Sequence, residues 1–467
     1  MKSDALNLEH EPAMTATVAQ YTPHIEALAR KLGLDYHPVD FELVPTTFMM
    51  EVAVYGLPVR MPHWSFGVRY IHQLIQHGMG NSRIFEVMFP GDPCHAYLVG
   101  SNTVAENSLV TAHVLGHADF ARNNHLFVRF ERMAGTHILE HSAAQAHRIE
   151  AAVTEFGAAH VEAVLDAALA LEAHIDTNLE LHRPLYPQRV EAAESADTED
   201  SFRKRFKDLP GEAVPAVSIP PRLAPVPPNP EYDLLWFIAH YAPELQDWER
   251  DVFLAVREES FYFYPVFACQ IMNEGWATYW HARLLAEADF LPENLYLDAI
   301  KAHSDVVRPY AAEQQAALAV NPYHLGFSMW SDIVDKHGID KARQICREED
   351  DFGFVRNYLD RELAERLGLF VFEAEEGGGI KVSTNDIDRV REAILAPRFN
   401  FGAPRIHVSE LRHDGSLVLR HDHESDGRGL DLRRAATVLE YMNRIWRRPV
   451  FLHTVDASGS SHELVAK

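Results

Sequence analysis

The sequence has few cysteines and few basic residues for its length. Its three cysteines, Cys94, Cys269 and Cys346, are widely spaced among 467 residues. Scattered thiols in odd number are typical of a reducing compartment and argue against a disulfide framework or a zinc knuckle. Lysine and arginine together number 43, against 68 aspartates and glutamates, so the formal net charge is −25. This acidic excess argues against a nucleic-acid-binding surface and against a polybasic membrane-binding surface.

A hydrophobic run long enough to cross a membrane, which takes about 18 residues, is also missing. The most apolar window, residues 163–171, is short and contains Asp166. Residues 1–12 have neither the basic start nor the apolar core of a signal peptide. Hydrophobic residues make up 47% of the chain and charged residues 24%, as in ordinary globular proteins. We therefore expect a globular cytoplasmic protein without a transmembrane segment.

Apolar residues recur with helical spacing along most of the first 375 residues. The helices predicted in this way cover residues 16–33, 103–128, 143–181 (with a break at Gly157) and 232–367. Eight prolines lie between Pro210 and Pro230, a density that excludes a helix there. We expect residues 207–230 to form an extended Pro-rich strap, either across a large helical domain at 1–375 or between two domains.

The pattern changes after the three glycines at 377–379. The elements predicted beyond them are a helix at 385–395, strands at 405–412 and 416–421, a helix at 430–446 and a strand at 450–455. An Asp-Gly turn at 414–415 between two alternating apolar runs indicates a hairpin. The fold class is thus mainly α with a few short strands, and residues 376–467 form a small C-terminal α+β domain.

Histidine is unusually frequent, with 27 residues and no poly-histidine tract to account for them. His113 and His117 lie four residues apart in a predicted helix, so both rings leave the same face one turn apart. A helix supplies two nitrogen ligands to a metal ion in this way. Asp119 is a candidate to accept a hydrogen bond from the outer N–H of a ligating histidine. The alternative is a pair of partly buried histidines bonded to the backbone and to Asp119.

A second candidate segment contains Glu274 and His281, which are seven residues apart and therefore share a helix face. Large apolar residues surround them, among them Trp276 and Trp280. A buried carboxylate requires a cation, a metal ion or a proton, because its desolvation is costly. We predict Glu274 and His281 as further metal ligands. A carboxylate paired with a histidine or an arginine in the core is the alternative.

Three further residues are candidates for supporting roles. Glu258 and Glu259 lie among apolar neighbours on a predicted helix, so one of them is expected to point inward, where it can act as a general base. A salt bridge to Arg250 or Arg257 is an equally good interpretation. His240, on the helix after the Pro-rich strap, is a candidate for the layer around the metal ligands.

Several long motifs together resemble one family, the SpoVR family of stage V sporulation protein R-like proteins. The motifs are Arg60-Met61-Pro62-His63-Trp64-Ser65-Phe66-Gly67, His113 to Phe120, Pro230 to Leu235, Arg257 to Phe263, Asn273 to His281 and Asn321-Pro322-Tyr323-His324-Leu325-Gly326. The resemblance covers about residues 15–460. It implies a link to the spore cortex, a peptidoglycan layer, or to stress physiology. It also implies, as possible partners, a serine protein kinase and a von Willebrand A-like protein encoded in the same operon.

A weaker likeness concerns the chemistry. The segment Glu274-Gly275-Trp276-Ala277 is similar to the helix that provides the third ligand in gluzincin metallopeptidases, and His113 and His117 correspond to their histidine pair. The sequence departs from that pattern at Val114, which stands where those enzymes have a water-activating glutamate. It contains no HExxH, no Gly-x-Ser-x-Gly and no phosphate-binding Gly-rich loop. Either the base comes from elsewhere, for instance Glu258 or Glu259, or the protein catalyses no hydrolysis.

Two hypotheses follow from these observations. The first is a metal-dependent hydrolase of peptide or cell-wall-precursor bonds, with zinc as the expected divalent ion. The second is a non-enzymatic scaffold or regulator that binds a protein partner, in which the same residues form a buried polar network. A di-iron site would require Glu-x-x-His pairs, and the chain offers only the reversed His147 and Glu150. We expect no metal ligand from the C-terminal domain, and we expect residues 231–285 to pack against residues 103–128.

Overall fold

The computed structural model describes residues 11–78, 86–134, 137–178, 226–309, 320–374, 380–384 and 386–467. The chain divides into two compact units, and each is described by itself. Unit 1 is Met1–Leu165 with Ala255–Ala403, and unit 2 is Asp166–Leu254 with Pro404–Lys467. The described residues include only 226–230 of the predicted Pro-rich strap. The predicted domain boundary at residues 375 and 376 lies outside them. That boundary therefore stays a prediction.

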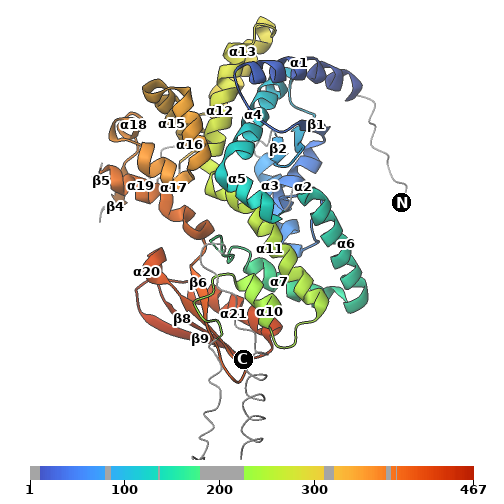
Figure 1. Cartoon of the computed structure of the whole chain (residues 1–467), viewed down its shortest axis with the longest axis vertical. Helices are drawn as coiled ribbons and strands as arrows, with labels where there is room; N and C mark the ends of the chain where they lie inside the picture. Colours follow the sequence, from blue (N-terminus) through green and yellow to red (C-terminus); the bar gives the residue numbers. More distant parts are fainter. Residues whose placement is uncertain are drawn as a thin grey trace, which may run out of the picture. The chain divides into compact units, whose positions relative to one another are not determined.

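Unit 1 is mainly helical, which confirms the predicted fold class. Figure 1 labels its α-helices, which are α1 (Glu11–Lys31), α2 (Thr46–Tyr55), α3 (Trp64–Gly78), α4 (Val104–Asn123), α5 (His125–Ala134), α6 (Ile138–Phe156), α12 (Gln270–Ala286), α13 (Glu293–Val306), α15 (Pro322–His337), α16 (Ile339–Glu348), α17 (Asp351–Tyr358), α18 (Arg361–Arg366) and α19 (Ile387–Leu395). A 3₁₀ helix, η2 (Ala396–Gly402), follows α19. Helices α7 (Ala158–Ala170) and α11 (Asp247–Ala268) each cross a boundary between the units. Within the described ranges, no helix is long and apolar enough to span a membrane.

Two small sheets complete unit 1. Strands β1 (Val39–Val44), β3 (Cys94–Val99) and β2 (Glu86–Phe89) form a sheet in that order, with β1 parallel and β2 antiparallel to β3. The second sheet has two antiparallel strands, β4 (Val371–Ala374) and β5 (Ile380–Thr384). Strand β2 brings an acidic side chain to the helical core, because its first residue, Glu86, faces His113 of α4.

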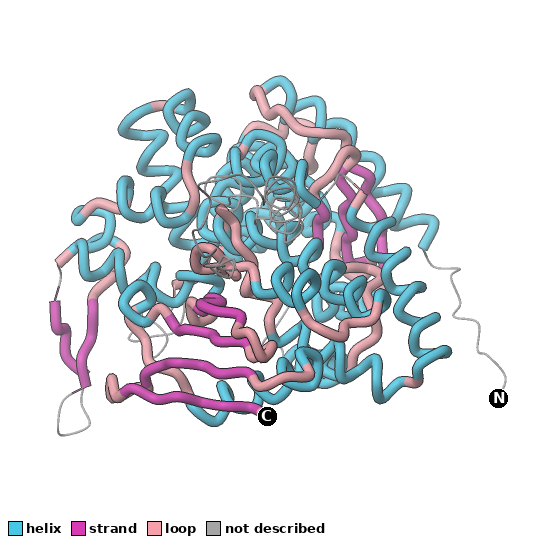
Figure 2. Tube along the Cα trace, turned by 60° about the horizontal axis from the view of Figure 1, so that its bottom comes forward, coloured by secondary structure: helices cyan, strands magenta, loops and turns pink. Residues whose placement is uncertain are grey.

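Unit 2 contains the α+β arrangement predicted near the C-terminus (Figure 2). Its elements include α10 (Leu234–Tyr241), β6 (Ile406–Leu411), β7 (Leu417–His421), α20 (His423–Asp426), α21 (Leu432–Trp446), β8 (Val450–Val455) and β9 (Ser461–Ala466). The sheet order is β6-β7-β8-β9, and α21 forms the crossover between the parallel strands β7 and β8. The bounds of β6, β7, α21 and β8 agree with the predicted elements to within two residues. The edge strand β9 is not among the predicted elements.

Local side-chain contacts set the ends of α4. Thr103 and Glu106 form a reciprocal capping box at its start. The helix stops before Asn124, whereas the predicted helix continues to residue 128. The Asn124 amide donates hydrogen bonds to the backbone oxygens of Cys346 and Glu349, at 2.8 and 2.9 Å. These contacts hold Asn124 in an extended conformation, which separates α4 from α5.

Helix α12 packs closely between α4 and α15, and small residues make both crossings possible. A Cβ atom on Gly116 of α4 would lie 2.6 Å from the Cα of Ala277. A Cβ atom on Gly275 would overlap the backbone of Gly326 on α15. The predicted packing of residues 231–285 against residues 103–128 is confirmed for α12. These two crossings fix the position of Glu274, which immediately precedes Gly275 on α12.

Candidate metal centre

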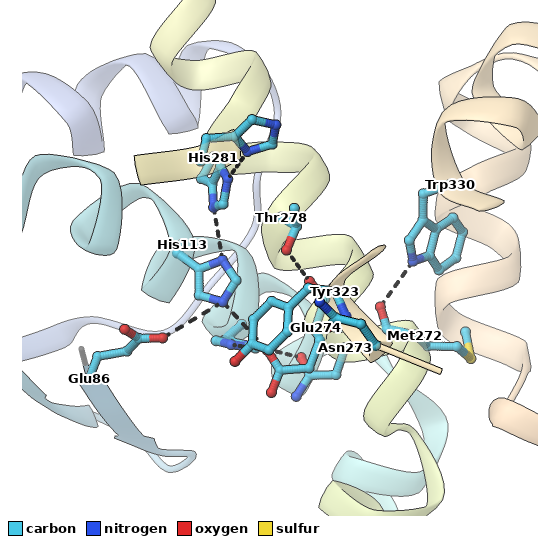
Figure 3. Close-up of polar contacts among 12 residues, drawn as sticks. Glu86, His113, Met272, Asn273, Glu274, Thr278, His281, Tyr323 and Trp330 are labelled. Atoms are coloured by element: carbon cyan, nitrogen blue, oxygen red, sulfur yellow. Dashed lines mark hydrogen bonds and ion pairs between the residues drawn. The ribbon is translucent and has the colours of Figure 1, made fainter. Parts of the chain in front are cut away.

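His113 of α4 and Glu274 of α12 meet in the interior of unit 1 (Figure 3), and His117, one turn further along α4, contacts the same carboxylate. His113 and His117 are both buried, with ring centroids 4.5 Å apart and nearly perpendicular planes. The Oε2 atom of Glu274 lies 3.5 Å from the Nε2 atom of His113 and 3.5 Å from that of His117. Two nitrogens and a carboxylate oxygen from two helices therefore face one small region.

Two of these three atoms are buried without a hydrogen-bond partner among the described residues. They are the Nε2 atom of His113 and the Oε2 atom of Glu274. Buried polar atoms in folded proteins almost always have partners, because leaving one unsatisfied costs about 1–3 kcal/mol. Two such atoms facing each other are consistent with a shared partner that the protein atoms do not supply.

A fourth group, Glu86, joins the centre from strand β2, and it is not among the residues predicted from the sequence. Its Oε1 atom lies 3.8 Å from the Nε2 atom of His113. Glu86, His113 and His117 each offer one ligand atom, and these atoms lie within 4.8 Å of one another. Figure 3 shows Glu86 and Glu274 approaching His113 from opposite sides. The available signal in the sequence is a single charge inside the apolar run of residues 84–89.

Burial and mutual charge perturb all four groups. Burial alone would raise the pKa of Glu274, but the two histidines outweigh it and hold that pKa below its usual range. Burial, together with the neighbouring His117, lowers the pKa of His113 to about 4. Burial opposes the charged form of His117 as well, yet Glu274 raises the pKa of that ring. Burial, reinforced by the charge of Glu274, raises the pKa of Glu86 to about 7.

The outer nitrogen of His117 has a partner other than the one expected from the sequence. Its Nδ1 atom lies 2.8 Å from the Oδ1 atom of Asn273, which accepts the N–H and leaves Nε2 free to face Glu274. The carboxylate of Asp119 is engaged elsewhere. It accepts hydrogen bonds from the backbone N–H of Asp35 at 2.6 Å and from the indole N–H of Trp276 at 2.8 Å. Asp119 thus helps to fix α12 against α4 rather than orienting a histidine.

His281 lies behind His113. Its Nδ1 atom is 3.0 Å from the Nδ1 atom of His113, and its Nε2 atom is 2.6 Å from the Nδ1 atom of His303 on α13. Both ring nitrogens of His281 therefore face other imidazoles, and neither is directed at Glu274. The structure brings His281 to the centre but places it in a second layer around His113.

Glu258 and Glu259 have partners of their own on neighbouring elements. Glu259 is buried, and its Oε2 atom lies 2.7 Å from the Nε atom of Arg60, whose side chain is 7% exposed. Glu258 is half-buried, with one oxygen 3.0 Å from His141 and the other 2.7 Å from the amide of Gln145. The salt-bridge interpretation considered from the sequence thus holds for Glu259, although with Arg60 as its partner.

His240 lies in unit 2, on α10, and its side chain is exposed. Its Nδ1 atom lies 2.8 Å from the backbone oxygen of Trp236, one turn earlier in the same helix. This local contact explains its orientation without a metal. The predicted second-layer role finds no support in that environment.

Tyr323, near the start of α15, covers the front of the centre in Figure 3. Its ring stacks on that of His113 with centroids 5.9 Å apart. Asn321 caps α15 by accepting a hydrogen bond from the Tyr323 backbone N–H at 3.0 Å, and Pro322 occupies the first turn. The cap fixes the start of the helix and so brings the aromatic ring over His113.

The start of α12 is held by a carboxylate from another helix. Asp351 accepts hydrogen bonds from the backbone N–H groups of Ile271 and Met272, both at 2.9 Å. The indole N–H of Trp330 donates to the backbone oxygen of Met272 at 2.9 Å. These contacts anchor the first turn, so Glu274 presents its carboxylate from a fixed backbone. The four convergent donor atoms, two imidazole nitrogens and two carboxylate oxygens, match the preferences of zinc and of similar divalent ions.

Comparison with known proteins agrees with the family resemblance seen in the motifs. Residues 13–402 match the family described as SpoVR like protein, and residues 404–457 match the SpoVR-like C-terminal domain. The chain belongs to the SpoVR family. It is 28% identical to the Uncharacterized protein YcgB of Escherichia coli (strain K12), in an alignment that covers 98% of this chain and 96% of that protein. No solved structure matches the chain.

Proposed function

We propose that this SpoVR protein binds one divalent ion, zinc, through His113, His117 and Glu274. The observation that carries the proposal is a pair of buried atoms, Nε2 of His113 and Oε2 of Glu274, that have no hydrogen bond within the part of the chain the structure describes. The Nε2 atom of His117 lies at the same 3.5 Å distance from that oxygen. An ion among these three atoms would satisfy all of them. Three protein ligands leave a fourth zinc position for water or substrate, which is the arrangement of catalytic zinc sites.

The reaction that suits this centre is hydrolysis of an amide bond. A bound zinc ion acidifies water and polarises a carbonyl oxygen. Glu86, whose Oε1 atom lies 3.8 Å from the Nε2 atom of His113, would act as the general base in place of the glutamate that Val114 replaces. The water oxygen would attack the carbonyl carbon, the C–N bond would break, and the water proton would pass through Glu86 to the departing amine. Tyr323 would bound the space above the ion.

The substrate class rests on the family rather than on the centre. The resemblance to proteins linked to the spore cortex favours peptide bonds of cell-wall precursors, or peptides more generally. The alternative function, a scaffold for a protein partner such as a serine protein kinase, treats the same residues as a buried polar network. Such a network is most stabilising when every polar atom has a hydrogen bond, and among the described residues the Nε2 atom of His113 and the Oε2 atom of Glu274 have none.

Metal analysis of the purified full-length chain tests the binding step. We expect about one zinc per chain, and loss of it in H113A and H117A, because each removes one of three ligands. His147 provides a matched control, since it is an exposed histidine bonded to the backbone oxygen of Ala143. H147A should retain the ion. Wild-type protein without zinc after reconstitution would contradict the proposal.

Peptide hydrolysis tests the chemical step. We would offer zinc-loaded protein a quenched fluorogenic peptide library and, separately, a muramyl pentapeptide, and detect the new amine by mass spectrometry. E86Q should retain zinc while kcat falls by about 10²–10⁴-fold, the range associated with loss of a general base. Zinc-loaded protein that cleaves neither probe would contradict the hydrolase proposal and favour the scaffold.

A further inference from the structure

Three imidazoles form a continuous chain that leads away from the candidate metal centre. The Nδ1 atoms of His113 and His281 lie 3.0 Å apart, and the Nε2 atom of His281 lies 2.6 Å from the Nδ1 atom of His303. The three rings come from three helices, α4, α12 and α13. His281 is fully buried, while His303 is half-buried beside the ring of Phe327. Figure 3 shows His281 on the side of His113 away from Tyr323.

Counting protons restricts the tautomers of this chain. Two ring nitrogens at hydrogen-bond distance share one proton, since one must donate and the other accept. The chain has two such contacts, which use two of the three protons carried by three neutral rings. The third proton must then sit at one end, either on Nε2 of His113 or on Nε2 of His303. The two arrangements run in opposite directions, and all three rings change tautomer together.

A metal ion at His113 selects one of these two arrangements. Coordination needs the lone pair of Nε2, so the third proton must lie on His303 and every N–H of the chain must point outward from the ion. In the opposite arrangement His113 carries its proton on Nε2 and cannot bind metal. The acceptor atom Nδ1 of His281 is therefore what keeps His113 in the competent tautomer.

We propose that His281 and His303 are positioning residues for the metal centre, which set the tautomer of His113 through this directed chain. The inference rests on the proposed zinc site and extends it to two residues that do not touch the ion. Loss of a group that orients a metal ligand typically weakens metal binding by about 10–100-fold. The effect should be largest at His281, which contacts His113 directly, and smaller at His303.

The test is zinc affinity, measured by competition with a fluorescent chelator on the full-length chain. H281L, which removes the acceptor, should bind zinc about 10–100-fold more weakly. H281N should recover most of the affinity, because the Asn oxygen can stand in for the Nδ1 acceptor. L284A is the matched control, since Leu284 is a buried residue on the same helix that is apolar. It loosens the core and should leave zinc affinity within about threefold of wild type.

A second measurement needs no substitution of the three histidines. Nitrogen-15 spectra of histidine-labelled, zinc-loaded protein should show His113 protonated on Nδ1, and His281 and His303 protonated on Nε2. Unchanged affinity in H281L, or the opposite tautomers in the zinc-loaded wild type, would overturn the positioning role while leaving the zinc site intact. A wild type that binds no zinc would overturn the proposed function and this inference with it.

Discussion

Glu274 and His113 meet across the crossing of α12 and α4, where Oε2 and Nε2 lie 3.5 Å apart, buried and without a hydrogen bond from any described residue. Each residue is otherwise well held, His113 by His281 and Tyr323, and Glu274 by the anchored first turn of α12. The fold thus fixes both side chains, and the two atoms that face each other are in ion-pair range but have no hydrogen bond among the described residues. A shared metal ion would complete both of them.

Neutralising Glu274 should abolish metal binding without unfolding the protein. E274Q keeps the shape of the side chain but removes the charge, so we expect less than about a tenth of an equivalent of zinc. E258Q is the matched control, because Glu258 is a half-buried glutamate with partners on another helix. It should keep the full zinc content. Zinc analysis and circular dichroism on the two variants check this, and an E274Q protein that still holds one equivalent would count against the ligand role.

Zinc binding should weaken as the pH falls through the neutral range. Glu274 raises the pKa of His117 above the ordinary value of 6.5, so a proton competes with the ion for that ring. Below this raised pKa, each unit of pH should cost about tenfold in affinity, because binding then displaces one proton. His113 adds no competition until its pKa of about 4. Chelator competition between about pH 5.5 and 8 measures the slope, and a flat profile would exclude His117 as a ligand.

Adding a methyl group to Gly275 should damage both the fold and the metal centre. Its Cβ atom would overlap the backbone of Gly326, and neither backbone can move independently. We expect G275A to lower the free energy of unfolding by about 1–3 kcal/mol and to reduce zinc affinity. Gly67 is the control, an exposed glycine on α3 whose added Cβ would meet nothing within 4 Å. G67A should be neutral or stabilising by up to about 1 kcal/mol. Thermal or urea unfolding distinguishes them, and equal stability of the two variants would be the contrary outcome.

Glu259 should prove structural. It pairs with Arg60, whose side chain is 7% exposed, so E259Q removes the negative charge from a largely buried ion pair. Loss of one member of such a pair destabilises a protein by about 3–5 kcal/mol. Zinc content should not change, in contrast to E274Q. Parallel unfolding curves and zinc analysis decide the question. A stable E259Q protein that had lost its hydrolytic activity would instead restore Glu259 as the catalytic base.

The helical fold is predictable because its signals are local. The spacing of apolar residues predicts helices where α1, α4, α6 and α12 lie, and Gly157 marks the break between α6 and α7. The helix predicted at 143–181 ends earlier, at Ala170, where turns follow. The Asp-Gly turn locates the β6–β7 hairpin. Strand β9 escapes prediction because Ser461–Ala466 alternates exposed and half-buried residues at a sheet edge, and has few β-branched or aromatic residues. The division of the chain into units depends on contacts between distant segments, which periodicity does not report.

The candidate centre is predictable only for residues whose side-chain direction follows from their spacing along one helix. His113 and His117 share a face because four residues advance about one turn. Asp119 follows His117 by two residues, which is about 200° around the helix, so it points away from the centre. The hydrogen bond to His117 predicted for Asp119 is made by Asn273. Asn273 lies next to Glu274 on α12, whereas His117 lies on α4. Glu86 comes from a strand, and only the tertiary fold brings it to His113.

The most direct test of the zinc centre is the anomalous scattering of zinc-loaded crystals at the zinc absorption edge. We predict one peak per chain, about 2.0–2.2 Å from Nε2 of His113, Nε2 of His117 and a carboxylate oxygen of Glu274. A peak bound by any of the buried cysteines, or the absence of a peak between these three residues in fully loaded crystals, would contradict the account.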